Sequence, residues 1–403
     1  MLSAARPEVE LLVRCARSEL ETDRSSRVEA LVQEDLNWEF LLELARRHGV
    51  TPLLHSQLTM VAEPAIPDLV LECLQNAVRH NAEWNLHLTS ELRRLLDRFD
   101  EEDISVIPYK GPVLAQYAYD SLALREFADL DILIRRQDVQ KVKSLLESDG
   151  YRLTNFTPFP GYRENDILRR NTVILPRPEF AFYQGSNAIK VELRWQLGSG
   201  LRSFDVPFDE FWARHDEMTM AGRSVQSLSP EDRILVLTTH GWKHHWHRLE
   251  WICGIAAVLR RDEELSWPLV FARARELGRH KETLCSLLIA AKLLHVDLPE
   301  SVCNRVRTNP GVVSLASESS ARVINNFTSE PDPVSGLVFD LKVCENSVDA
   351  LSLLLHVIFY PRTPEYEFVP LPRRLHPVYY LIRPCRLAEH FGPKILHGWL
   401  FNQ

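Results

Sequence analysis

Residues 127–134 read Phe-Ala-Asp-Leu-Asp-Ile-Leu-Ile. Apolar residues first alternate with Asp129 and Asp131 and then continue without interruption, a pattern typical of a buried β-strand. Because successive side chains of a strand point to opposite faces, Asp129 and Asp131 share one face, about 6.5–7 Å apart along the strand. Leu130 and Ile132 fill the other face. The segment therefore predicts a strand that presents two carboxylates on the same side.

The residues around this strand predict an alternation of strands and helices. Residues 104–109 (Ile-Ser-Val-Ile-Pro-Tyr) form a short segment rich in β-branched residues, which predicts a strand. Residues 110–112 (Lys-Gly-Pro) then form a turn that opens a helical stretch through Tyr119. An amphipathic helix from Gln137 to Asp149 follows and is closed by Gly150. Further strands are expected at Thr172–Pro176, Phe180–Gln184 and Ala188–Gln196. Together these elements predict an α+β sheet domain.

Helices are predicted on both sides of this domain. Before it, apolar residues recur at helical spacing, with one helix ending at Gly49 and another running from about Pro67 to Phe99. After about residue 205 the chain returns to helices, and Ser229 caps one that holds His240 and His244. The expected organisation is a helical N-terminal region (1–100), a central α+β domain (101–200), a helical C-terminal region (201–360) and a Pro/Arg-bearing tail (361–403).

Composition excludes several classes of protein. The chain has 403 residues, 45% of them apolar and 25% charged, which are ordinary globular values. With 55 acidic and 47 basic residues the net charge is −8, so long nucleic acid is a disfavoured partner. The longest apolar stretch, Leu351–Tyr360, is roughly half of a membrane span and predicts a core helix at most. The first residues lack a signal-peptide pattern and the seven cysteines are scattered, so we expect a cytoplasmic protein with reduced thiols.

A later strand carries a third carboxylate. In residues 190–195 (Lys-Val-Glu-Leu-Arg-Trp) apolar residues alternate with polar ones, which places Glu192 on the polar face. If this strand pairs with residues 127–134, three carboxylates converge. They repel one another, and a divalent cation such as magnesium, which prefers oxygen ligands, keeps them ionised. Phosphoryl or nucleotidyl transfer is the chemistry indicated; the alternative is that Asp129 and Asp131 only solvate the end of a strand.

Several segments occur in an informative order and spacing. They are IPYKGPVLA (107–115), REFADLDILI (125–134), GY (150–151) and VELRW (191–195), with WEFLLELARRHG (38–49) before them and HGWKH (240–244) and RLEW (248–251) after them. This arrangement resembles the uncharacterised nucleotidyltransferase family of the DNA polymerase beta-like superfamily. The resemblance spans most of residues 35–265.

The resemblance implies a minimal nucleotidyltransferase core, a short mixed sheet with helices, in residues 101–200. It implies that Asp129 and Asp131 bind Mg²⁺ (or Mn²⁺) and that Glu192 is the third acid, which holds the catalytic metal and helps to deprotonate the acceptor. An NTP is the implied donor substrate. The acceptor is not identified by the sequence.

The resemblance also suggests roles for basic residues. Lys110 and Gly111 occupy a turn where the superfamily uses a Gly-Ser loop, and their ammonium and backbone N–H groups would neutralise the triphosphate. Arg125 is a second candidate on the phosphate side. This sequence departs from the pattern because it lacks the Gly-Ser pair, has Arg194 where relatives usually have His, and has Gly254 where many have Asp. Arg194 therefore puts a fixed cation on the substrate side.

A histidine cluster follows in the C-terminal region. His240, Lys243, His244 and His247 share one face if a helix continues through all of them. Three interpretations stay open. A His pair at this spacing binds zinc when a third ligand arrives; His240, Lys243 and His244 form a basic cluster that reaches the triphosphate or acceptor; or the histidines simply pack beside tryptophans.

The sequence thus predicts a magnesium-dependent enzyme that transfers a nucleoside monophosphate from NTP to an acceptor hydroxyl and releases pyrophosphate. One alternative is a degenerate, non-catalytic nucleotide-binding module, which Arg194 and Gly254 favour. Another is a protein-AMPylating or toxin-type transferase that uses the same acids, and a metal-dependent hydrolase is a weaker option. No membrane partner is expected.

Overall fold

The computed structural model describes residues 5–18, 22–154, 179–184, 189–197, 206–262, 264–325 and 333–389. They form two compact units, one extending to Leu153 and resuming from 179 to Val343, the other beginning at Cys344. The strand expected at Thr172–Pro176 lies outside the described residues. Within the described ranges, no helix combines the length and the apolar character needed to cross a membrane.

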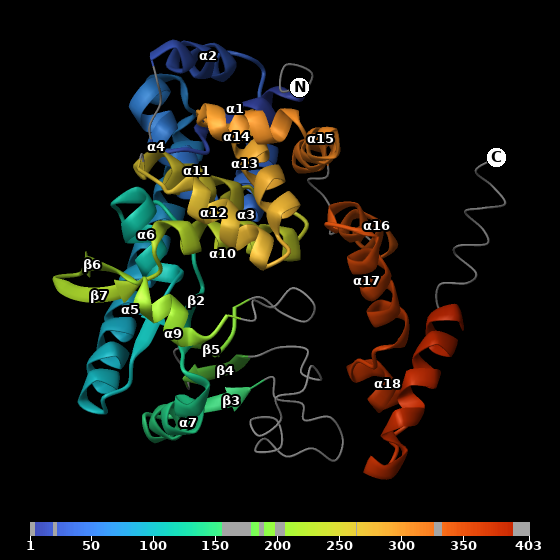
Figure 1. Cartoon of the computed structure of the whole chain (residues 1–403). Helices are drawn as coiled ribbons and strands as arrows, with labels where there is room; N and C mark the ends of the chain where they lie inside the picture. The colour runs from blue at the N-terminus through green and yellow to red at the C-terminus, as the bar shows by residue number, and fades with distance from the viewer. Residues whose placement is uncertain are drawn as a thin grey trace, which may run out of the picture. The chain divides into compact units, whose positions relative to one another are not determined.

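The first unit contains a five-stranded mixed sheet (Figure 1). Its strands stand in the order β1-β2-β5-β4-β3. β2 runs parallel to β5, whereas β1 is antiparallel to β2 and β4 is antiparallel to β5. The strands are β1 (Val106–Pro108), β2 (Asp129–Ile134), β3 (Tyr151–Thr154), β4 (Glu179–Gln184) and β5 (Ile189–Arg194). The mixed sheet with helices confirms the α+β class predicted from the sequence.

Helices that precede the sheet in the chain and helices that follow it pack into one core in this unit. Buried Leu12 and Leu54 from the first helices belong to the same hydrophobic cluster as Ile255 and Leu287 from later ones. Figure 1 shows these helices gathered beside the sheet. The four-part domain division stays a prediction. The helices before the sheet are α1 (Pro7–Cys15), α2 (Thr22–Val32), α3 (Trp38–His48), α4 (Thr51–Ala62), η2 (Glu63–Ala65) and α5 (Asp68–Glu101).

The remaining helices of this unit lie between the strands or after them. They are α6 (Gly111–Tyr119), η3 (Arg136–Asp138), α7 (Val139–Ser148), α9 (Phe208–Ala213), α10 (Pro230–Lys243), α11 (Leu249–Arg261), α12 (Trp267–Glu276), α13 (His280–Leu294), α14 (Glu300–Arg307), α15 (Pro310–Asn325) and α16 (Pro333–Val343).

Two helix boundaries confirm the sequence prediction in detail. Gly49 ends α3 with φ +65°, a left-handed conformation that glycine adopts without a Cβ penalty. Ser229 caps α10, and its side chain accepts a hydrogen bond from the backbone N–H of Asp232. Both helix ends are therefore determined by a single local residue, Gly49 or Ser229, that can be recognised in the sequence.

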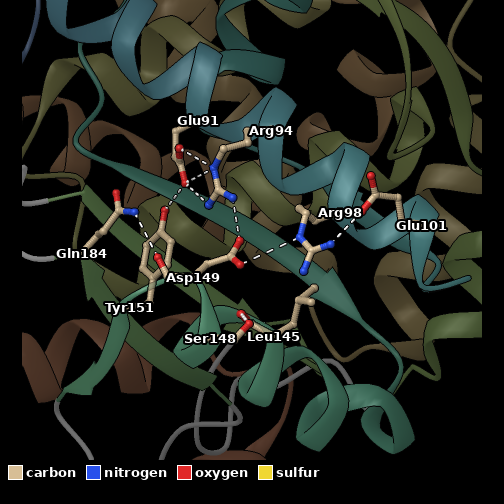
Figure 2. Close-up of polar contacts among 9 residues, drawn as sticks. All are labelled: Glu91, Arg94, Arg98, Glu101, Leu145, Ser148, Asp149, Tyr151 and Gln184. Carbon is tan, nitrogen blue, oxygen red and sulfur yellow. Dashed lines mark hydrogen bonds and ion pairs between the residues drawn. The ribbon is translucent and has the colours of Figure 1, made fainter.

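A polar network joins the long helix α5 to the edge of the sheet (Figure 2). Arg94 donates to Glu91 at 2.7 Å and to Asp149 at 2.6 Å, and the Tyr151 hydroxyl donates to Glu91 at 2.6 Å. The Arg98 Nε atom lies 3.9 Å from Asp149. Because Asp149 follows α7 and Tyr151 begins β3, these contacts hold α5 against both elements.

A separate hairpin corrects the expectation that the chain is helical after residue 205. β6 (Asp216–Met220) and β7 (Arg223–Ser227) pair antiparallel. Between them Ala221 and Gly222 have φ +48° and +76°. Positive φ at both turn residues matches the twist of the flanking strands, as in type I′ hairpins. The sequence signal was present, since Met218 and Met220 alternate with polar residues before the glycine.

The second unit consists of short helical segments around a charged interior. Glu365 is fully buried and bonds to Arg383 at 2.9 Å and to Arg386 at 2.7 Å. The helix expected at Leu351–Tyr360 forms, and because it contains no buried residue it is not a core helix. Buried Glu365, His376, Tyr379 and Arg383 lie instead in α18 (Thr363–Phe368), η6 (Arg373–Val378) and residues 379–389. The labelled segments are α17 (Ser347–Phe359), α18 (Thr363–Phe368) and η6 (Arg373–Val378).

Candidate active site

The parallel pairing of β2 with β5 brings three carboxylates together. Asp131 stands directly opposite Glu192 in the register, and Asp129 stands opposite Lys190. Because strand side chains alternate, all four side chains lie on one face of the sheet. Leu130 and its neighbours on the other face are buried. The pairing on which the sequence prediction depended is therefore present.

Two cations of β5 contact these carboxylates. Lys190 forms ion pairs with Glu192 and with Asp129, whose Oδ2 atom lies 3.3 Å from the Lys190 Nζ atom. Arg194 bonds to Glu192, and its Nε atom lies 3.7 Å from Asp131 Oδ1. Lys190 and Arg194 share the face of Glu192 because they stand two residues before and after it. Each acid therefore faces at least one cation.

Lys110 reaches the same carboxylates from the turn before α6. Its Nζ atom lies 3.7 Å from Asp131 Oδ1 and 3.3 Å from His240 Nδ1. Burial and the charge of Lys110 hold the pKa of His240 well below its usual range. Neutral His240 can therefore accept a hydrogen bond from the ammonium. Tyr109, to which the sequence analysis gave no role, donates its hydroxyl to Asp131 Oδ1 at 3.1 Å.

The charges divide the carboxylates into two kinds. Burial, and then the neighbouring Asp131 and Glu192, raise the pKa of Asp129. Burial also acts to raise the pKa of Glu192, but Arg194 and Lys190 outweigh it and lower this pKa to about 2. Glu192 is thus held ionised by its cations, while Asp129 carries the electrostatic cost of the crowding.

Gly111 is the first residue of α6, and Arg125 reaches it from the loop between α6 and β2. Gly111 has φ +53°, and a Cβ there would lie 3.0 Å from the Asp129 carbonyl oxygen, so glycine permits this close approach. Arg125 donates to the Gly111 carbonyl at 3.4 Å. The loop that carries Arg125 is held by α5, since Asn85 donates to the Leu122 and Arg125 carbonyls at 2.7 Å each. These contacts fix the approach of the chain to β2.

The histidine cluster does not lie on one continuous helix, which corrects the sequence prediction. α10 ends at Lys243, and His244 is its C-cap residue. His245 and Trp246 then adopt φ +50° and +56°. Two such residues in succession are strained, and the buried Trp246 ring is held directly over Gly241, where a Cβ would lie 2.1 Å from ring carbons. The turn is therefore locked by packing.

The locked turn groups three histidines around Trp251. The ring centroids of His240, His244 and His247 lie 5.5, 5.0 and 4.6 Å from the Trp251 ring. Burial and the charge of Lys243 lower the pKa of His244 to about 3. His240 therefore lies beside both Lys110 and His244, and burial and nearby cations keep the two histidines neutral. Lys243 is the last residue of α10, and its charge acts on both histidines. Trp251, from the RLEW segment, is the ring against which these histidines pack.

The carboxylates suit a hard divalent cation by their chemistry, since Mg²⁺ prefers carboxylate oxygens. Among the residues that the structure describes, no three His, Cys, Asp or Glu side chains are placed to hold a metal ion together. Lys190 and Arg194 contact the oxygens of Asp129 and Glu192 instead. A metal at these oxygens must therefore displace a cation of the protein.

The turn between α3 and α4 contacts the start of α11 and the loop before β2. His48 is buried, and its Nδ1 atom accepts a hydrogen bond from the backbone N–H of Leu249 at 3.1 Å, at the start of α11. Thr51 donates its backbone N–H to Glu126 at 3.2 Å. A Cβ on Gly49 would lie 2.6 Å from Glu250 Oε2, so this glycine also allows close packing.

The buried His48 predicts a loss of stability in acid. Burial, and then the charge of Arg248, lower the pKa of His48 from 6.5 to about 4. As the pH falls, the imidazole of the unfolded chain takes up a proton near pH 6.5, whereas buried His48 in the folded protein takes one up only near pH 4. The free energy of unfolding that His48 contributes is therefore fully present above pH 6.5 and is lost as the pH drops toward 4. At about 1.4 kcal/mol per pKa unit, the contribution is about 3 kcal/mol. Urea unfolding at several pH values should show a weaker acid dependence for His48→Asn, whose Oδ1 can still accept from Leu249. An unchanged pH dependence would contradict this role.

Sequence comparison assigns the chain to a family. Residues 34–295 match the profile described as Uncharacterised nucleotidyltransferase, which is more than half of the chain. The chain belongs to this family. The matched region includes the whole sheet and the α10–α11 turn. No curated protein sequence matches the chain significantly.

Two solved structures resemble parts of this nucleotidyltransferase family member. The lincomycin-bound crystal structure of lincosamide antibiotic adenylyltransferase LnuA has 17% sequence identity and a TM-score of 0.27, and the match covers 36% of this chain and 83% of that one. The crystal structure of ANT(2″)-Ia in complex with adenylyl-2″-tobramycin has 14% identity and a TM-score of 0.27, and covers 55% of this chain and 98% of that one.

Proposed function

We propose that the protein is a magnesium-dependent nucleotidyltransferase that moves a nucleoside monophosphate from NTP to an acceptor hydroxyl. The observation that carries this proposal is the register of β2 and β5, which sets Asp131 opposite Glu192 with Asp129 on the same face. Family membership supports the reaction class. Three carboxylates this close together require positive charge, and a triphosphate substrate requires it as well.

In this proposal Asp129, Asp131 and Glu192 would hold the metal. Bound Mg²⁺ (or Mn²⁺) would supply the positive charge that stabilises the triphosphate and the leaving pyrophosphate. The acceptor oxygen bonds to the α-phosphorus, and the bond from this phosphorus to the bridging oxygen breaks. Pyrophosphate leaves with the bonding electrons, and Glu192 helps to take the acceptor proton. Arg194 and Lys190 hold the pKa of Glu192 at about 2, so this carboxylate is ionised and has an oxygen that can accept the proton.

The donor side would be formed by the N-terminus of α6. Lys110 lies within ion-pairing distance of Asp131, and Gly111 brings the helix N-terminus close to Asp129. Backbone N–H groups at a helix start favour phosphate oxygens, and the ammonium adds a full charge. Arg125 would reach phosphate by leaving the Gly111 carbonyl, to which it now donates.

The acceptor side would be formed by Arg194, His240, Lys243 and His244. Because the two histidines are held neutral, each can both donate and accept a hydrogen bond, as recognition of a hydroxyl requires. Arg194 would keep a fixed positive charge between this group and Glu192.

A second candidate, the non-catalytic nucleotide-binding module, is favoured by one specific observation. Lys190 and Arg194 already pair with the acids that would bind metal. In a module that has lost catalysis these cations would permanently replace the metal. Nucleotide would then bind without dependence on magnesium.

Thermal unfolding with and without ligands tests the proposal without an acceptor. A ligand that binds the native state raises the melting temperature. We expect ATP, GTP, CTP or UTP to raise it only with magnesium and not with EDTA, and we expect Asp129→Ala/Asp131→Ala to lose the shift. A shift that persists in EDTA would support the second candidate instead. No shift with any of the four nucleotides would overturn both.

A further inference from the structure

We propose that Lys190 is a displaceable internal counter-ion that occupies the carboxylates until a divalent cation replaces it, and so sets the metal concentration that the site needs. This inference rests on the proposed metal site. It begins from the register, in which Lys190 stands opposite Asp129 and two residues before Glu192. The ammonium contacts both acids, at 3.3 Å from Asp129 Oδ2 and in direct ion pairing with Glu192.

Lys190 and Arg194 differ in how firmly they are held. The Lys190 side chain is 24% exposed, whereas the Arg194 side chain is 8% exposed and lies between Glu192 and Asp131. A lysine carries a compact ammonium on a flexible four-carbon stem, while arginine is a planar fork suited to a fixed pair. Lys190 can therefore move toward solvent, and Arg194 stays. Departure of Lys190 frees an oxygen of each of the two acids that it joins.

Displacement gives a quantitative expectation. If the ammonium occupies the carboxylates in most molecules, the apparent metal affinity is reduced by the fraction that is free to bind. Removing the ammonium should therefore tighten metal binding. It should also lower the stability of the metal-free protein, because Asp129 and Glu192 then repel each other without this cation.

Calorimetric titration with Mn²⁺ alone tests the idea, with melting temperatures recorded in EDTA. We expect Lys190→Gln to bind Mn²⁺ at least tenfold more tightly than the wild type and to melt at a lower temperature without metal. Lys190→Arg retains the charge and should not bind more tightly. Lys141→Gln removes a lysine paired with Glu102, away from these acids, and should match the wild type.

The outcomes separate the two proposals. Equal affinity in Lys190→Gln and wild type, with binding lost in Asp131→Asn, would overturn the counter-ion role and leave the metal site intact. Absence of Mn²⁺ binding in both Lys190→Gln and wild type would overturn the counter-ion role together with the metal site. Tighter binding in Lys141→Gln as well would attribute the effect to net charge and overturn the role of Lys190.

Discussion

Asp131→Asn is expected to lower nucleotidyl transfer by roughly a thousandfold, the scale on which loss of a group that stabilises transition-state charge acts. Asp131 is 4% exposed and lies opposite Glu192 at the centre of the carboxylate face. Asparagine keeps the shape but removes the charge that the proposed metal needs. The measurement is the rate of pyrophosphate release from NTP by wild type and variant, with a small-molecule extract as the source of the acceptor.

The same variant should fold. The asparagine oxygen can still accept the Tyr109 hydroxyl, and Arg194 keeps Glu192 as its partner. Asp97→Asn is a matched control, because Asp97 is 57% exposed and pairs with Arg223 outside the carboxylate face. Transfer at the wild-type rate in Asp131→Asn would sink the assignment. A thermal melt of Asp131→Asn distinguishes the two causes of lost activity. A variant that fails to fold shows no melting transition, whereas a folded variant without catalysis keeps it.

Gly241→Ala is expected to destabilise the protein by about 3 kcal/mol, at the upper end for overpacking in a core. The new Cβ would lie 2.1 Å from the Trp246 ring, which is 1% exposed and holds two residues in left-handed conformations. The ring must move, and the turn that sets His247 against Trp251 must move with it. Urea unfolding measures the loss of stability.

Gly254→Ala is the control, because we expect it to raise the free energy of unfolding where Gly241→Ala lowers it. Gly254 lies inside α11, and nothing stands within 4 Å of a Cβ placed there. Alanine at such a helix position should stabilise by about 0.5–1 kcal/mol. If both variants lost similar stability, the specific contact between Gly241 and Trp246 would not be the cause.

The sequence predicted the carboxylate face better than it predicted the charges around it. The two-residue period of a strand is a local property, so the shared face of Asp129 and Asp131 followed directly. Whether Glu192 meets them depends on a parallel pairing between distant segments, which the sequence could state only as a condition. Lys190 was placed on the polar face by the same period, but its contact with Asp129 depends on that register.

The histidine cluster shows where periodicity fails. A continuous helix would align His240, His244 and His247, but α10 ends at Lys243 and the next residues turn through left-handed conformations. The Trp246 ring packs on Gly241, five residues earlier, and its backbone N–H donates to the Gly241 carbonyl, so the turn does not follow the helical period. The glycine before a tryptophan-rich stretch was the available signal. The hairpin at β6 and β7 was missed although its turn glycine was equally local.

We propose that this member of the nucleotidyltransferase family transfers a nucleoside monophosphate to an acceptor hydroxyl. The most direct test follows label placed on the α-phosphate of each NTP, with magnesium and a small-molecule extract, in wild type and Asp131→Asn. We expect label in a new small-molecule product with an equal amount of pyrophosphate, and both should be absent in the variant. Label that stays in NTP, appears as free nucleoside monophosphate, or is found on protein would contradict it.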